Sequence, residues 1–150
     1  MKKFVFRFQT VLDTKIHLEE MYENELAVLI RTRHDEETRL GEMKRRLAGY
    51  YKEYAGHREA TIQEIRRYRD YFDKLNNDIE LQKQAVEKAT GDVETKREEL
   101  ISVQKEKLAL EKLKDKDYRK YQDKVMMWER KFLDEIATGN YIRNGGNRIN

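Results

Sequence analysis

The chain has 150 residues, of which 41% are charged, and its 32 Lys and Arg nearly balance its 29 Asp and Glu to leave a net charge of +3. Ala, Glu, Leu, Lys and Arg make up almost half of it, a composition typical of long helices and coiled coils. The absence of proline argues against a β-sandwich or barrel, and the absence of cysteine excludes disulfides and thiolate metal sites. The hydrophobic content of 38% suits a narrow seam better than a thick core.

The charge pattern also limits the partners that we expect. Basic and acidic residues alternate as on a solvated helix face, whereas nucleic-acid domains show a clustered basic excess. No apolar run approaches the roughly 20 residues of a membrane span, and Lys2 and Lys3 precede no apolar segment of a secretory signal. We therefore expect no nucleic-acid partner and no direct membrane insertion, and the absence of cysteine fits a reducing cytoplasm.

The first predicted element is a helix over about residues 5–54. A 4-3 spacing of mostly apolar or aromatic positions runs through it, which marks a helix that supercoils about a shared seam. The positions are Phe8, Leu12, Lys15, Glu19, Tyr22, Leu26, Leu29, Arg33, Glu36, Leu40, Met43, Leu47, Tyr50 and Tyr54.

A turn over about residues 55–60 follows, in which Gly56 can take the positive φ that closes a helix. A short connection between long helices makes them antiparallel neighbours. The alternative is one unbroken helix that dimerises, because a glycine inside a helix costs only about 1 kcal/mol.

The second predicted helix covers about residues 61–138. It carries the same spacing at Ile65, Tyr68, Phe72, Leu75, Ile79, Gln82, Val86, Ala89, Val93, Lys96, Leu100 and Val103.

An antiparallel match of the two spacings places Tyr50 beside Tyr68 and Glu36 beside Gln82. A single polar layer such as Glu36 with Gln82 commonly fixes the register of a coiled coil. Tyr22 against Lys96 fits less well, so we expect the seam to fray towards the chain termini. The fold class is therefore all-α, a long antiparallel two-helix coiled-coil hairpin over residues 1–138 whose second helix is longer than the first.

The longer second helix leaves an apolar stripe without a partner helix, at Tyr121, Val125, Trp128, Phe132 and Ile136. Unpaired apolar stripes mark partner surfaces. Two other interpretations stay open, namely that Phe4 and Phe6 fold back over the stripe, or that the chain forms a homodimer.

Aromatic residues are also in excess near the turn, at Tyr50, Tyr51, Tyr54, Tyr68, Tyr71 and Phe72. Aromatic side chains are favoured as interface anchors. The alternative is a tyrosine-rich seam whose hydroxyls reach water.

Residues 139–150 hold three glycines and four asparagines, so we expect a disordered tail after a C-cap at Gly139.

No catalytic pattern is present. The residues three before His17, His34 and His57 are not glutamates, so the Glu-x-x-His motif of di-metal bundles is missing. No glycine-rich phosphate loop is present either. We therefore expect no enzyme, no metal and no cofactor.

Three segments resemble the FliJ family of the bacterial flagellar type III export apparatus. Residues 4–12, FVFRFQTVL, are similar to the family's opening, with Phe8 in place of its usual Leu. Residues 110–116 and 129–137, LEKLKDK and ERKFLDEIA, resemble later family segments, with Arg130 in place of the usual Gln.

The resemblance implies an antiparallel coiled coil similar to the stalk of rotary ATP synthases. It implies binding to the hexameric flagellar export ATPase, to the cytoplasmic part of the membrane export gate and to export chaperones, at the cytoplasmic side of the cell membrane. By analogy with stalk geometry, the ATPase would bind Tyr121, Val125, Trp128, Phe132 and Ile136. The gate would bind Met43, Leu47, Tyr50, Tyr54, Tyr71 and Leu75.

Two other functions compete with this one. A generic coiled-coil spacer or tether would need no exposed aromatic stripe. A membrane-surface amphipathic helix would need a polar face rich in Lys and Arg, whereas the first helix mixes acids with bases there.

Overall fold

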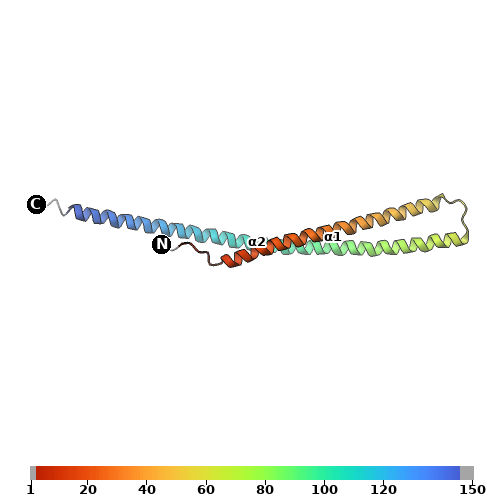
Figure 1. The fold of residues 1–150 in the computed structure, drawn as a ribbon, viewed down its shortest axis with the longest axis horizontal. Helices are drawn as coiled ribbons and strands as arrows, with labels where there is room; N and C mark the ends of the chain where they lie inside the picture. The colour runs from red at the N-terminus through yellow and green to blue at the C-terminus, as the bar shows by residue number, and fades with distance from the viewer. Residues whose placement is uncertain (1–2, 146–150) are drawn as a thin grey trace. The chain divides into compact units, whose positions relative to one another are not determined.

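The computed structural model describes residues 3–145 and contains two helices, α1 (Gln9–Gly56) and α2 (Ile62–Gly145), which pack antiparallel (Figure 1). The prediction of an all-α hairpin with a longer second helix is confirmed. Residue contacts divide the chain into two compact units. We call Leu18–Val103 the hairpin unit, and Met1–His17 together with Gln104–Asn150 the terminal unit.

The core of the hairpin unit is a single seam between the two helices. Its most enclosed residues all lie on the predicted 4-3 spacing, because that spacing keeps one face of each helix towards the other. Val93 is 0% exposed. The other buried members of this seam are Leu75, Ile79, Gln82, Ala89 and Val103.

One polar layer interrupts the apolar seam. Gln82 Nε2 donates to the backbone oxygen of Glu36 at 3.0 Å and to the Glu36 carboxylate. A buried amide needs such partners, since an unsatisfied polar group costs about 1–3 kcal/mol. The predicted pairing of Glu36 with Gln82 is confirmed, and a shift of one heptad would leave Gln82 opposite an apolar layer.

The predicted fraying towards the chain termini is wrong. Lys96 lies in the seam with its Nζ 4.4 Å from the centroid of the Tyr22 ring. The same Nζ lies 2.8 Å from a Glu25 carboxylate oxygen and 2.6 Å from one of Glu99. These hydrogen bonds raise the pKa of Lys96 well above its usual value. Lys96 therefore fits in the seam, because its ammonium group lies over the Tyr22 ring while its charge is paired with two carboxylates.

The terminal unit has helix-to-helix contacts of its own. Leu12 is buried, and Lys15 forms an ion pair with Glu106. Exposure rises towards the turn instead, where Tyr54 and Ile65 are both exposed.

The turn closes without the predicted left-handed glycine. Gly56 is the last residue of α1, and no residue that the structure describes has a positive φ. His57 takes over the capping, since its backbone N donates to Tyr54 O at 3.1 Å. A capping box then starts α2: Thr61 N donates to Glu64 Oε2 at 2.8 Å, and Glu64 N donates to Thr61 Oγ1 at 3.3 Å.

The start of α1 differs from the expected start near residue 5. Residues 3–6 have no regular secondary structure, and the chain turns so that Gln9 N donates to Phe6 O at 3.2 Å. Phe6 is only 4% exposed. Its burial explains why the helix begins at Gln9, because continuing the helix back to residue 5 would place this ring elsewhere.

The end of α2 also differs from the expected end near residue 138. The helix continues through Gly139 to Gly145, and Thr138 Oγ1 donates to Asp134 O at 2.7 Å. One glycine inside a helix costs only about 1 kcal/mol, which the uninterrupted hydrogen bonds on either side offset. Residues 146–150 of the predicted tail lie outside the described residues.

Replacing Val93 by Ala should lower the free energy of unfolding by about 1–3 kcal/mol, because it leaves a cavity in the most enclosed layer. Val28→Ala is the matched control, since Val28 is 65% exposed, and it should change stability by less than about 0.5 kcal/mol. Urea unfolding followed by circular dichroism measures both. Equal losses would mean that the seam does not carry the stability.

Candidate partner-binding surfaces

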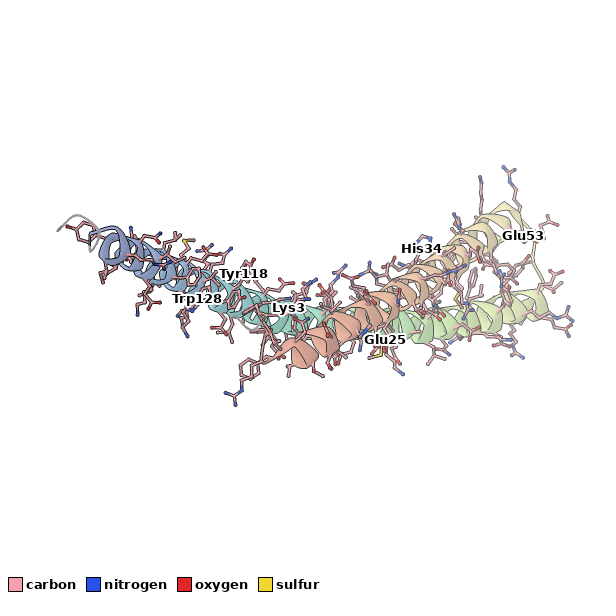
Figure 2. The ribbon with its side chains drawn as sticks, turned by 60° about the vertical axis from the view of Figure 1, so that its left-hand side comes forward. Lys3, Glu25, His34, Glu53, Tyr118 and Trp128 are labelled. Atoms are coloured by element: carbon pink, nitrogen blue, oxygen red, sulfur yellow. The ribbon has the colours of Figure 1, made fainter. Side chains whose placement is uncertain are left out.

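The first candidate surface lies in the part of the terminal unit around Trp128, where no second helix accompanies α2 (Figure 2). We call Tyr121, Val125, Trp128, Phe132 and Ile136 the terminal stripe. Tyr121 and Val125 are half-buried, but Trp128, Phe132 and Ile136 are 52%, 49% and 46% exposed. Three large apolar side chains on adjacent turns are therefore available to a partner.

Two of these side chains hold each other in place. The Trp128 and Phe132 rings stack with their centroids 5.6 Å apart and their planes 7° apart. Residues four apart are neighbours on a helix surface. The stacking presents the pair as one flat aromatic surface, which would lose little conformational freedom on binding.

Sequence reasoning missed three exposed apolar residues beside the stripe, namely Met126, Met127 and Leu133. Met126 and Leu133 each follow a stripe residue by one position, so they widen the apolar face on one side. A helical wheel of the sequence could have found them. Methionine suits such a site because its flexible thioether adapts to irregular partners.

The start of the stripe is covered by the chain's own residues. The Phe4 ring lies 5.2 Å from the Tyr118 ring and 5.6 Å from the Tyr121 ring, measured between centroids. The alternative in which Phe4 folds back is therefore correct for this one layer. It does not extend to Trp128 and the turns that follow.

The second candidate surface lies in the hairpin unit near the turn. We call Met43, Leu47, Tyr50, Tyr54, Tyr71 and Leu75 the hairpin cluster. Leu75 is buried in the seam, so it supports the cluster without offering contact area. Met43, Leu47, Tyr50 and Tyr71 are half-buried, and Tyr54 is exposed.

Tyr50 is the centre of an aromatic network. Its ring centroid lies 4.2 Å from that of Tyr71, 5.1 Å from that of Phe72 and 5.2 Å from that of Tyr68. Desolvation raises the pKa of Tyr50, and the neighbouring Tyr68, Glu53 and Tyr71 raise it further.

Tyr51 and Ile65 extend the hairpin cluster beyond the predicted set. Tyr51 stacks on Phe72 with centroids 4.1 Å apart and planes 20° apart. Both Tyr51 and Ile65 are exposed and line a groove together with Tyr54, Tyr68, Arg69 and Phe72. The sequence indicated this extension through Tyr51, an aromatic residue that lies outside the 4-3 spacing.

Other kinds of site find no support in the described part of the chain. Between residues 3 and 145 no group of three or more His, Asp or Glu is arranged to hold a metal ion. Neither α1 nor α2 has an apolar stretch long enough to cross a membrane.

Comparison with known proteins gives one match. The family described as Flagellar FliJ protein matches residues 3–146. No curated protein and no solved structure matches the chain. The matched range includes every residue of both candidate surfaces.

Tyr50→Ala should lower the free energy of unfolding by about 1–3 kcal/mol, because it removes three ring contacts from the seam. Trp128→Ala should change it by less than about 0.5 kcal/mol, because Trp128 is 52% exposed and stacks on Phe132 of its own helix. Thermal unfolding followed by circular dichroism compares the two. A large loss for Trp128→Ala would mean that its ring stabilises the isolated chain.

Proposed function

The chain belongs to the flagellar FliJ family, a non-catalytic part of the flagellar export apparatus, and we propose that it couples the export ATPase to the membrane export gate. In this proposal the terminal stripe binds the ATPase hexamer and the hairpin cluster binds the cytoplasmic part of the gate. The chain also assists export chaperones, and it acts at the cytoplasmic side of the cell membrane.

The exposed aromatic pair of the terminal stripe carries the ATPase assignment. Trp128 and Phe132 are each about half exposed on a stretch of α2 that has no partner helix. Hot spots of protein interfaces are enriched in tryptophan and consist of a few large, well-oriented side chains. The flanking Met126 and Leu133 would close around such a centre and exclude water.

The hairpin cluster supports the gate assignment in a different way. Tyr50 and Tyr71 are half-buried and packed together, while Tyr51 and Tyr54 face solvent next to them. A rigid ring network with its outer members exposed costs little ordering on binding. Arg69 in the same groove adds a cationic group that can bind a carboxylate on the partner.

Coupling requires more than simultaneous binding. The chain alters the output of the ATPase only if it binds the different states of the hexamer with different affinities. Both surfaces include residues of the continuous helix α2, Tyr71 in one and Trp128 in the other. No loop interrupts α2 between the two surfaces, so a displacement of one surface can be transmitted to the other through this helix.

The second candidate function is a generic coiled-coil spacer or tether outside protein export. The terminal stripe argues against it, because a spacer gains nothing from three exposed apolar side chains that promote aggregation. Co-purification with the export ATPase distinguishes the two functions.

Alanine at both Trp128 and Phe132 should weaken binding to the export ATPase by at least about tenfold, as expected for interface hot spots. Helicity should stay the same, because both side chains lie outside the seam. Titration calorimetry measures the affinity, and Tyr141→Ala is the matched control because Tyr141 is an exposed aromatic residue on the same helix. Unchanged affinity of the double variant would remove the terminal stripe from this interface.

Serine at both Tyr54 and Tyr71 should weaken binding to the export gate by about tenfold and leave ATPase binding unchanged. Tyr50 is kept, so that the centre of the ring network survives. Pull-down with the cytoplasmic part of the gate, alongside the ATPase titration, measures both affinities. Loss of ATPase binding with intact gate binding would reverse the assignment of the two surfaces.

A further inference from the structure

The segment before α1 is a strap with one fixed and one loosely held aromatic side chain. We define the strap as residues 3–8, which precede the helix. Phe6 is its anchor, since its ring is 4% exposed and its backbone oxygen accepts a hydrogen bond from Gln9 N. Val5 between the two aromatics is 81% exposed.

Phe4 is the loosely held end of the strap. Its ring is half-buried and lies against Tyr118 and Tyr121 of α2. Tyr121 is also the first residue of the terminal stripe. Phe4 therefore occupies part of the apolar face that continues through Val125 to Trp128.

We propose that the strap regulates the terminal stripe: the Phe4 ring lies against Tyr121, the first residue of the stripe, and a docking protein displaces it to bind the whole stripe. The inference rests on the proposed function, because it takes the export ATPase as the docking protein. The strap is then an internal competitor for the first layer of that interface.

The strengths of the two attachments decide which part of the strap moves. Phe6 is enclosed, so releasing it would expose a full aromatic side chain. Phe4 is held by two ring contacts, and each aromatic pair changes an equilibrium constant by roughly twofold to tenfold. A partner that offers a larger apolar surface can replace contacts of this size.

Competition of this kind lowers the apparent affinity of the partner. If only a fraction of molecules have Phe4 lifted from α2, the measured Kd rises by the inverse of that fraction. In the absence of the partner, Phe4 lies against the half-buried Tyr121 ring and so shortens the exposed part of the stripe, whereas Tyr118 remains 46% exposed.

The first test compares Phe4→Ala with Val5→Ala in titrations against the export ATPase. Phe4→Ala removes the competitor, so we expect binding roughly twofold to tenfold tighter than for the unmodified chain. Val5→Ala removes a neighbouring side chain that is solvent-exposed, and it should bind as the unmodified chain does. Unchanged or weaker binding by Phe4→Ala would overturn the proposal.

The second test locks the strap in place. The chain has no cysteine of its own, so a short bismaleimide can join Phe4→Cys to Tyr118→Cys without competition from other thiols, and the monomeric cross-linked chain is separated by size. The cross-linked chain should bind the ATPase more weakly than the same variant with both thiols capped by a monofunctional maleimide. Equal affinities of the linked and capped forms would contradict displacement.

A third measurement separates the strap from the proposed function. The dye 1-anilinonaphthalene-8-sulfonate binds exposed apolar surface and needs no protein partner. Phe4→Ala should raise its fluorescence, and Val5→Ala should not. If this holds while no form of the chain binds the ATPase, the proposed function fails and the covering of the stripe stands. If Phe4→Ala does not raise the fluorescence, the strap covers nothing and the inference is wrong.

Discussion

The narrowness of a seam between two helices is the constraint on which the rest of the structure depends. Such a seam encloses one line of side chains from each helix, and here it also accommodates a polar layer, Glu36 with Gln82, and a paired lysine at Lys96. Gln82 is hydrogen-bonded to Glu36, and Lys96 is paired with Glu25, so each of these two side chains has a partner on the facing helix. The seam thereby gains a defined register without a thick apolar core.

The same constraint explains why apolar side chains remain outside. Since α1 begins at Gln9, the described part of the chain offers the later turns of α2 no second helix, and the Phe4 ring of the strap lies against Tyr118 and Tyr121. Near the turn, the aromatic side chains outnumber the places in the seam, so Tyr51 stacks on the outer side of Phe72. Both candidate surfaces therefore consist of apolar side chains for which a seam between two helices has no room.

The seam was predictable from sequence because a 4-3 spacing over many turns determines which face of each helix is buried, and the turn near Gly56 favoured pairing of the two helices within one chain. Tyr50 beside Tyr68 and Gln82 bonded to Glu36 follow from matching the two spacings. Three features were not predictable, since each depends on contacts distant in sequence or on weak local preferences. Because Phe6 is buried, α1 begins later than expected. Because Lys96 forms salt bridges with Glu25 and Glu99, it fits in the seam between the two helices. Because a single glycine destabilises a helix only slightly, α2 continues past Gly139. The terminal stripe followed from periodicity, but its widening by Met126 and Leu133 required the neighbouring helix positions on one side of it to be considered.

The position of Trp128 has a spectroscopic consequence. It is the only tryptophan in the chain, and its indole is about half exposed beside Phe132. Indole emission shifts to shorter wavelength when water is replaced by apolar surroundings. Every change in the solvation of this one helical turn is therefore readable from intrinsic fluorescence, without an attached label and without a second chromophore of the same kind to subtract.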